Sequence, residues 1–238
     1  MPSSDRHLTL AIEASNPSAA SGGSGPGVAA GLVGSGGSLE VLGVEMLRST
    51  ARHDDDLMPA IDRLWARVGA PRSAIRRVAV SIGPGGYTGL RVAIVGAKLI
   101  AEAVGAMCVG VPSALVVARR AAPDTPAPFA VALASKAETT VVSVFRERGG
   151  TGSIAREIGA SELADLNVRA IIADRHLPLP IRARCTAAGV RIDEPVFDPV
   201  ACLEASGLVA PVEPARLLPI YGREPEAVRK WREMHPGG

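Results

Sequence analysis

Residues 81–91, with the sequence Ser-Ile-Gly-Pro-Gly-Gly-Tyr-Thr-Gly-Leu-Arg, limit the folds open to this chain more than any other stretch. The β-branched run before the glycines predicts a buried strand. Three glycines and a proline within residues 83–86 then predict a tight turn. Thr88 is a suitable N-cap, and residues 90–104 continue as a helix until Gly105, a typical C-terminal signal. The stretch therefore predicts a strand, a glycine loop and a helix in direct succession.

The glycine loop is a candidate phosphate-binding loop. A loop of this kind at a helix N-terminus exposes backbone N–H groups, and the helix dipole favours an anion there. The loop fits neither common phosphate pattern: G-x-x-x-x-G-K-[ST] needs Gly at Thr88 or Leu90, and G-x-G-x-x-G meets Thr88 again. Direct phosphate contact and a purely structural turn both stay open. The candidate phosphate ligands are Gly83, Pro84, Gly85, Gly86 and Thr88.

The predicted helix at residues 90–104 has an unusually narrow polar face. Its polar residues Arg91, Lys98 and Glu102 fall within about 40° of one another, and the rest of the circumference is apolar or small. Such a helix must be covered on two sides. Either it is buried within its own chain, or it packs against its own sheet and a partner subunit.

The remaining pattern predicts an α/β protein with two lobes. Residues 1–122 read as β-β-β-α-β-α-β-α, a meander followed by crossovers, which is typical of a mixed sheet covered by helices on both faces. Three prolines within residues 123–128 predict a linker. Residues 123–238 form a smaller second lobe whose element order weakly echoes the first, which suggests an internal duplication. The C-terminal helix, residues 224–233, is expected to return to the first lobe.

Composition and isolated residues exclude several functions. The net charge of +2 does not require a nucleic-acid partner, and the three cysteines are scattered without C-x-x-C spacing, as in reduced cytoplasmic proteins. There is no apolar run of 18 residues and no export signal, so we expect a cytoplasmic protein without a membrane segment. His53 precedes three aspartates, but consecutive carboxylates at a helix start point in different directions. We therefore predict no metal site and no catalytic residue: the four histidines form no H-x-x-x-H or H-x-x-E-H motif, and no nucleophile motif occurs.

The glycine stretch resembles the G-P-G-[SG]-[FY]-T-G-L-R motif of the TsaB family. Further matches are residues 12–15 in the first strand, residues 110–113, and two scattered sets: His53 with Leu57, Met58, Pro59 and Ile61, and Tyr221 with Arg223, Pro225, Glu226, Ala227 and Val228 in the tail. The departures are Glu13, a longer acid than the family's usual Asp, Ala14, which lacks the family's hydroxyl, and residues 133–140, which match the family's second-lobe segment only loosely. The resemblance thus extends from the first strand to the C-terminal tail.

The resemblance implies a two-lobed actin/Hsp70-like fold and a non-catalytic role. Members of the family act as dimerization subunits that bind and stabilise TsaD, in the complex that transfers threonylcarbamoyl to the adenosine next to the tRNA anticodon. Partners would be TsaD, the ATPase TsaE, tRNA through the complex, and a second copy when the chain is alone, with weak ATP or ADP binding at the partner interface. The alternative is an ATP-dependent sugar-kinase-like enzyme, with Glu13 as the metal-orienting acid. The interface residues expected are Tyr87, Thr88, Leu90, Arg91, Ala93, Ile94, Gly96 and Ala97.

Overall fold

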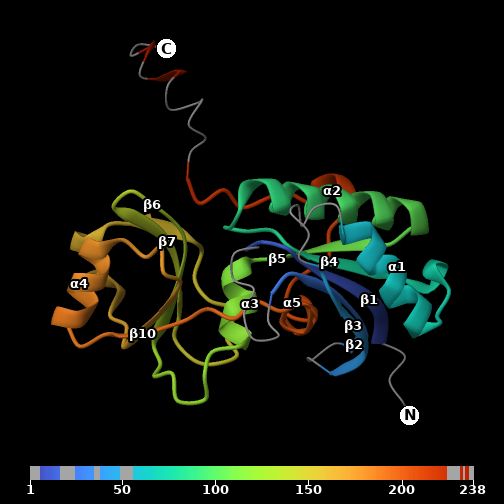
Figure 1. Cartoon of the computed structure of the whole chain (residues 1–238), viewed down its shortest axis with the longest axis horizontal. Helices are drawn as coiled ribbons and strands as arrows, with labels where there is room; N and C mark the ends of the chain where they lie inside the picture. The colour runs from blue at the N-terminus through green and yellow to red at the C-terminus, as the bar shows by residue number, and fades with distance from the viewer. Residues whose placement is uncertain are drawn as a thin grey trace.

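Two mixed β-sheets of five strands each form the frame of the structure (Figure 1). The computed structural model describes residues 6–16, 25–34, 38–48, 56–223, 231–232 and 234–235, and the sheets are counted over these residues. Among the helices of this part of the chain, none has both the length and the apolar character needed to cross a bilayer.

The first sheet has the strand order β3-β2-β1-β4-β5. Its first three strands form an antiparallel meander, while β1, β4 and β5 run parallel. Each parallel step passes through a helix, as parallel neighbours require. The elements are β1 (Arg6–Glu13), β2 (Gly27–Gly34), β3 (Leu39–Met46), α1 (Leu57–Val68), η4 (Arg72–Ala74), β4 (Arg77–Ser81), α2 (Tyr87–Val104), β5 (Met107–Val111) and α3 (Ser113–Arg119). Apart from the short 3-10 turn η4, this is the predicted order.

The second sheet repeats the topology of the first. Its order is β10-β9-β6-β7-β8, again a meander of three strands whose first member has a parallel neighbour on its other side. The identical strand order supports the predicted internal duplication. The elements are β6 (Phe129–Lys136), β7 (Thr139–Phe145), β8 (Arg156–Ile158), η5 (Ala160–Glu162), η6 (Ala164–Leu166), β9 (Ala170–Ala173), α4 (Leu179–Ala187) and β10 (Arg191–Asp193).

Side chains along β1 point alternately to the outer and the inner face of the first sheet, and the two sets belong to different hydrophobic clusters. Leu8, Leu10 and Ile12 are buried in one hydrophobic cluster with α1 and α2, which cover the outer face of the first sheet. Ala11, between them in sequence, belongs to a second cluster on the inner face. Successive side chains of a strand point to opposite faces, so one strand supplies both cores.

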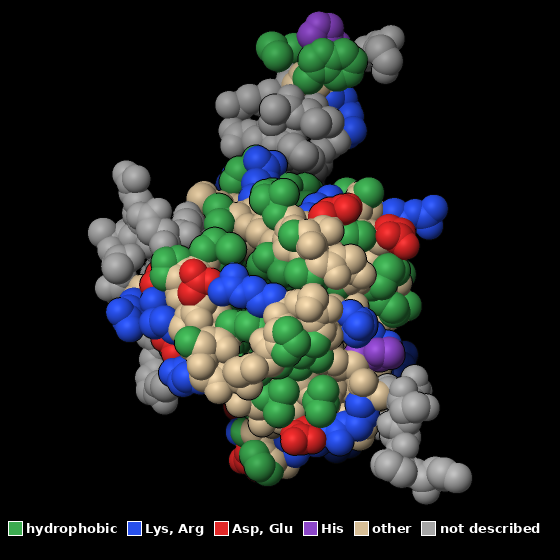
Figure 2. Space-filling model, turned by 90° about the vertical axis from the view of Figure 1, so that its right-hand side faces the viewer, with side chains coloured by type: hydrophobic (Ala, Val, Ile, Leu, Met, Phe, Trp, Pro, Cys, Tyr) green, Lys and Arg blue, Asp and Glu red, His purple; other side chains and the backbone are tan. Residues whose placement is uncertain are grey.

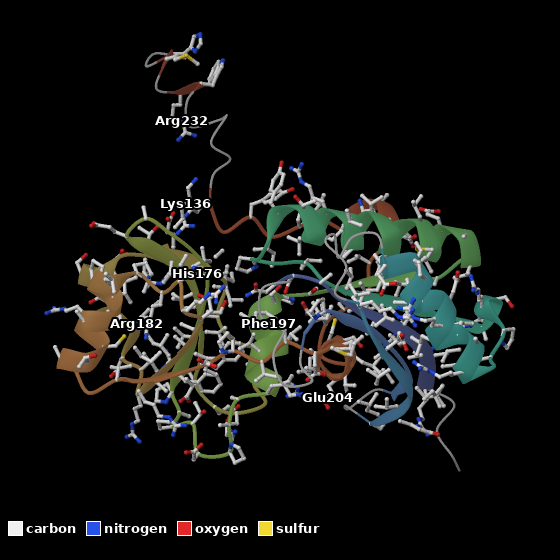
Figure 3. All side chains as sticks on the ribbon, in the orientation of Figure 1. Lys136, His176, Arg182, Phe197, Glu204 and Arg232 are labelled. Carbon is white, nitrogen blue, oxygen red and sulfur yellow. The ribbon has the colours of Figure 1, made fainter. Side chains whose placement is uncertain are left out.

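The inner cluster lies between the two sheets and contains α3 and a further helix, α5 (Pro199–Ser206) (Figure 1). Small residues on the first sheet, among them Ala11 and Ala79, meet Ala201 and Ala205 of α5, so the helix can lie close to the strands. Phe197, just before α5, is buried in this cluster, and Figure 3 places it between the two halves of the molecule. Both sheets thus share one inner core.

The chain returns to the first lobe earlier than predicted. The expectation was a return at residues 224–233, but α5 already packs on the first sheet. Val212 then forms two backbone hydrogen bonds with Cys108, at 2.7 and 2.9 Å, along the free edge of β5. Apolar residues in α5 and at Leu217 complete the first-lobe cores, which draws this part of the chain back.

The predicted C-terminal helix falls largely outside the described residues. Of residues 224–233, only 231 and 232 are described, and in Figure 1 they lie beyond both sheets. We keep the division of the chain near residue 122 as a proposal. Its support is that strands before it join the first sheet and strands after it join the second.

Arg120 provides a test of the inner layer. It lies directly after α3, and its guanidinium binds Asp198, the N-cap of α5, at 2.5 Å and Glu204 at 2.8 Å. Replacement of Arg120 by Ala would leave two partly buried carboxylates without their cation. We expect the free energy of unfolding to fall by about 2 kcal/mol, measured by urea denaturation.

The matched control is Arg72→Ala. Arg72 pairs with Asp62 at 2.6 Å, but both side chains are more than half exposed. Its loss should cost less than about 1 kcal/mol. Equal losses for the two variants would show that Arg120 does not hold α3 to α5.

Candidate functional site

The glycine loop connects β4 to α2 as predicted, with one shift at the helix start. Gly86 is the N-cap and Tyr87 the first helical residue, so Thr88 lies inside the first turn instead of capping it. Gly83 has a φ of 100°, which favours glycine. At the other end Gly105 is the left-handed C-cap, as the sequence indicated.

Backbone contacts hold the loop against its neighbours. The N–H of Gly83 donates to the Ser113 hydroxyl at 3.1 Å, and the N–H of Gly86 donates to the Ser15 carbonyl at 2.6 Å. A β-carbon on Gly85 would lie 2.2 Å from that same carbonyl oxygen. Two N–H groups of the candidate phosphate loop therefore already have protein acceptors. The loop packs directly against Ser15, which follows the end of the first strand.

Glu13 lies beneath this contact and is fully buried. Its Oε1 accepts hydrogen bonds from the Ser15 N–H at 2.8 Å and the Ser15 hydroxyl at 2.7 Å, while Oε2 has no hydrogen-bond partner. Burial raises the pKa of Glu13 to about 7, and the Ser15 hydrogen bonds only partly oppose that rise. Burial therefore favours the uncharged form of this carboxyl more than water would.

Four of the predicted interface residues lie in the chain's own core, so these predictions are wrong. Leu90, Ala93, Ile94 and Ala97 are all at most 5% exposed and pack on the first sheet. Gly96 faces α1, since a β-carbon there would lie 3.4 Å from Leu57. The sequence could not decide the orientation because nearly every side of α2 is apolar.

The exposed face of α2 carries different apolar residues. Val95 is 54% and Leu99 66% exposed, one turn apart, and Tyr87 lies two turns before Val95. The other predicted interface residues, Thr88 and Arg91, are exposed on the same helix. Figure 2 views the end of the molecule that carries α1 and the last turns of α2, and hydrophobic side chains recur across it.

Met58 of α1 adds to the exposed apolar surface. This α2 face, defined by Tyr87, Thr88, Arg91, Val95 and Leu99, is the strongest candidate for a docking surface.

A cavity of about 270 Å³ opens at the start of α2. One wall is formed by residues 220–223, the end of a segment, residues 217–223, that we call the strap. The Arg91 guanidinium lies 3.7 Å from the centre of the Tyr87 ring, and its Nε donates to the Tyr221 hydroxyl at 3.2 Å. The cavity lining is Pro84, Gly85, Tyr87, Leu90, Arg91, Ala134, Val141, Ile220, Tyr221, Gly222 and Arg223.

The strap joins both lobes, which the sequence did not reveal. Its Ile220 N–H donates to the Ile82 carbonyl in the first lobe at 2.7 Å. Its Arg223 binds Glu157 at 2.5 Å and the Ala134 carbonyl in the second lobe. Tyr221 and Arg223 had matched the family pattern, but a motif match does not identify partners that lie far away in the sequence.

The described residues contain no group of three or more His, Cys, Asp or Glu side chains arranged to hold a metal ion. His53 and the two aspartates after it lie outside the described part of the chain, so the structure leaves that position untested. Cys108 is buried in β5, and burial raises its thiol pKa to about 11, which leaves it unreactive near neutral pH.

Comparisons with known proteins agree with this arrangement. A crystal structure of an uncharacterized Pseudomonas aeruginosa protein with similarity to peptidase YeaZ matches with a TM-score of 0.64 and 18% identity, over 91% of this chain and 100% of that one. The structure of YeaZ from Pseudomonas aeruginosa matches with a TM-score of 0.63 and 18% identity, over 90% and 99% of the two chains. No curated protein gives a significant match. At this identity the likeness concerns the fold alone: the chain shares the fold of the YeaZ structures over about nine tenths of its length.

The family follows from a direct sequence match. The model described as TsaD, tRNA N6-adenosine threonylcarbamoyltransferase, matches residues 43–175, more than half of the chain and including the whole glycine stretch. This match and the YeaZ structures together confirm the resemblance carried by residues 81–91. The chain therefore belongs to the TsaD family.

Proposed function

We propose that this chain is a non-catalytic scaffold subunit of a tRNA-modifying complex. It binds a TsaD-like catalytic subunit and stabilises it for the transfer of threonylcarbamoyl to the adenosine next to the anticodon. A TsaE-like ATPase and the tRNA join through that complex, in the cytoplasm. When the catalytic partner is absent, a second copy of the chain occupies the same surface. Family membership and the YeaZ-like fold support this role.

The exposed α2 face is the observation that carries the proposal. The opposite side of α2 is already buried on the first sheet, yet Val95 and Leu99 extend into solvent from a long, regular helix. Neighbouring exposed residues, Tyr87 and Arg91, belong to the types enriched at protein interfaces. A partner helix packed along this face would bury Leu99 and Val95 together, because they lie one turn apart.

The kinase-like alternative receives less support from the geometry. A kinase of this fold would use Glu13 to orient a metal beside a phosphate on the glycine loop. Glu13 is instead buried with a raised pKa, and Gly85 and Gly86 are in direct contact with Ser15. We infer that Glu13 is a structural residue that fixes the turn at Ser15. Weak nucleotide binding elsewhere on the partner interface stays a prediction.

Leu99→Glu tests the docking surface. A charge at the centre of an apolar contact would be desolvated without a partner, which typically costs 2 kcal/mol or more. We expect the affinity for a TsaD-like subunit to fall by about 30-fold or more, and the homodimer to weaken in parallel. Calorimetry would measure the affinity for the TsaD-like subunit, and analytical sedimentation would measure the dissociation of the homodimer.

Leu179→Glu is the matched control. Leu179 begins α4 in the second lobe and is also largely exposed, so the same substitution should leave binding unchanged. Circular dichroism should show a native fold for both variants. Ala93→Glu is unsuitable for this purpose, because Ala93 is buried and the variant would unfold. Wild-type affinity in folded Leu99→Glu would remove α2 from the interface.

Glu13→Gln tests the structural role of Glu13 through pH. The pKa of Glu13 is raised from 4.5 to about 7, so the folded state binds the proton more tightly than the unfolded state. The tighter proton binding therefore contributes to the free energy of unfolding. This contribution is fully present below pH 4.5 and is lost as the pH rises through 7, by at most about 3 kcal/mol. Gln cannot ionise, so the variant lacks this loss. Between pH 5 and pH 8 we therefore expect the free energy of unfolding of Glu13→Gln to rise relative to that of wild type. Urea denaturation at each pH would measure this difference.

The same variant separates the two functional proposals. A scaffold should keep its affinity for a TsaD-like subunit when Glu13 becomes Gln. If the stability difference between variant and wild type were the same at pH 5 and pH 8, the titration of Glu13 would not be linked to folding. An ATP-dependent phosphoryl transfer lost in this variant would support the kinase-like enzyme.

A further inference from the structure

The strap holds the root of the C-terminal tail in a fixed place. Leu217 is buried in the first-lobe core, and Ile220 is hydrogen-bonded to the loop before α2. At the other end, Arg223 donates to the carbonyl of Thr139 at 2.8 Å in addition to its ion pair with Glu157. A β-carbon on Gly222 would lie 2.4 Å from a methyl of Val141, so the backbone lies directly on β7. Residue 223 therefore leaves the body at the edge of the cavity.

The cavity beside the strap is shaped for a large, mainly apolar side chain. Its volume of about 270 Å³ exceeds that of a single aromatic side chain. Leu90, Val141 and Ile220 form apolar walls, and the rings of Tyr87 and Tyr221 stand at its edge with centres 6.3 Å apart. Aromatic edges and faces favour a further ring in tilted or offset contact. The guanidinium of Arg91 is a cation suited to an indole face.

The tail carries the matching side chains. Trp231 is 54% and Met234 69% exposed, and they are three residues apart in a short helical stretch, so both lie on one side of it. The His235 ring stacks on the Trp231 ring with centres 4.8 Å apart. In Figure 3 this stretch, marked by Arg232, lies beyond both sheets. Two large apolar side chains are thus presented to solvent a short distance along the chain from an apolar cavity.

Chain length permits contact within one molecule. Trp231 follows Arg223, a cavity residue, by eight positions, and eight extended residues span at most about 27 Å. A tether of this length gives an effective concentration in the millimolar range. A contact with a dissociation constant of about 1 mM would then be formed about half of the time, without any second molecule.

We propose that Trp231, supported by Met234, docks into the cavity between α2, β7 and the strap of its own chain. In the docked arrangement the indole lies against Tyr87 and Tyr221. The observations behind this interaction do not rest on the proposed function, although Tyr87 and Arg91 belong to both the cavity and the α2 face. It would place the C-terminal tail next to the first turn of α2 and cover Tyr87.

Fluorescence of Trp231 tests the proposal on the full-length chain. The chain has two tryptophans, and Trp65 is buried in the first-lobe core, so Trp65→Phe leaves Trp231 as the reporter. The reference is a synthetic peptide of residues 224–238, in which Trp231 is fully accessible. We expect acrylamide quenching of Trp231 to be about twofold weaker in the protein than in the peptide. The emission maximum should shift to shorter wavelength.

Variants of the cavity wall identify the docking site. Tyr87→Ala with Tyr221→Ala removes two exposed rings from the edge of the cavity and should restore peptide-like quenching. Leu218→Ala is the matched control, because Leu218 is exposed on the strap but is not part of the cavity lining. Leu218→Ala should leave Trp231 as well protected from acrylamide quenching as it is in the parent protein. Circular dichroism and the emission of Trp65 in the wild-type background report whether each variant is folded.

The contrary results are distinct. Peptide-like quenching in the Trp65→Phe protein would overturn the proposal, because the tail would then be undocked. Protection that persists in the double tyrosine variant would place Trp231 elsewhere and would also overturn it. Protection that appears only as protein concentration rises would indicate docking into a second copy. Protection that is constant between about 1 and 100 μM, far below the effective concentration of the tether, supports docking within one chain.

Discussion

Gly86 donates its N–H to the Ser15 carbonyl at 2.6 Å, and Gly85 lies so close to the same oxygen that no β-carbon would fit. This contact joins the end of the first strand to the start of α2. It fixes the N-terminus of α2 beside the end of the first strand. Because glycine has no side chain, the backbone of the glycine loop can lie directly against the backbone at Ser15.

A second constraint is the layer shared by the two sheets. α3 and α5 lie between them, and small residues on the strands let α5 approach closely. Arg120 and Asp198 connect the two helices at their ends, and Glu204, labelled in Figure 3, accepts a second hydrogen bond from the same guanidinium. The lobes therefore do not pack as two separate cores. Together with the strap, this layer makes the position of one sheet depend on the other.

The elements of the first lobe could be predicted from the sequence, and the candidate site only in part. Strand, loop and helix around residues 81–91 follow from glycine placement and β-branched runs, and Gly105 ends the helix where expected. The sequence also contains a local signal for α5: Asp198 as N-cap, Pro199 at the first helical position and Gly207 at the end. The interface residues were half wrong because Leu90, Ala93, Ile94 and Ala97 turned out to be core. No local pattern distinguishes them from Val95 and Leu99.

The sequence by itself determined the family, the order of the elements and the need for a glycine loop, because these depend on local backbone preferences and on a motif of neighbouring residues. Tertiary structure decided which side of α2 is exposed. Its polar stripe is too narrow to orient the helix, so the choice rests on where the first sheet and α1 provide apolar contacts. Tertiary structure also decided the role of the strap. Arg223 meets Ala134, 89 residues earlier, only because the two lobes close around the start of α2, and no local sequence pattern encodes a contact of that range.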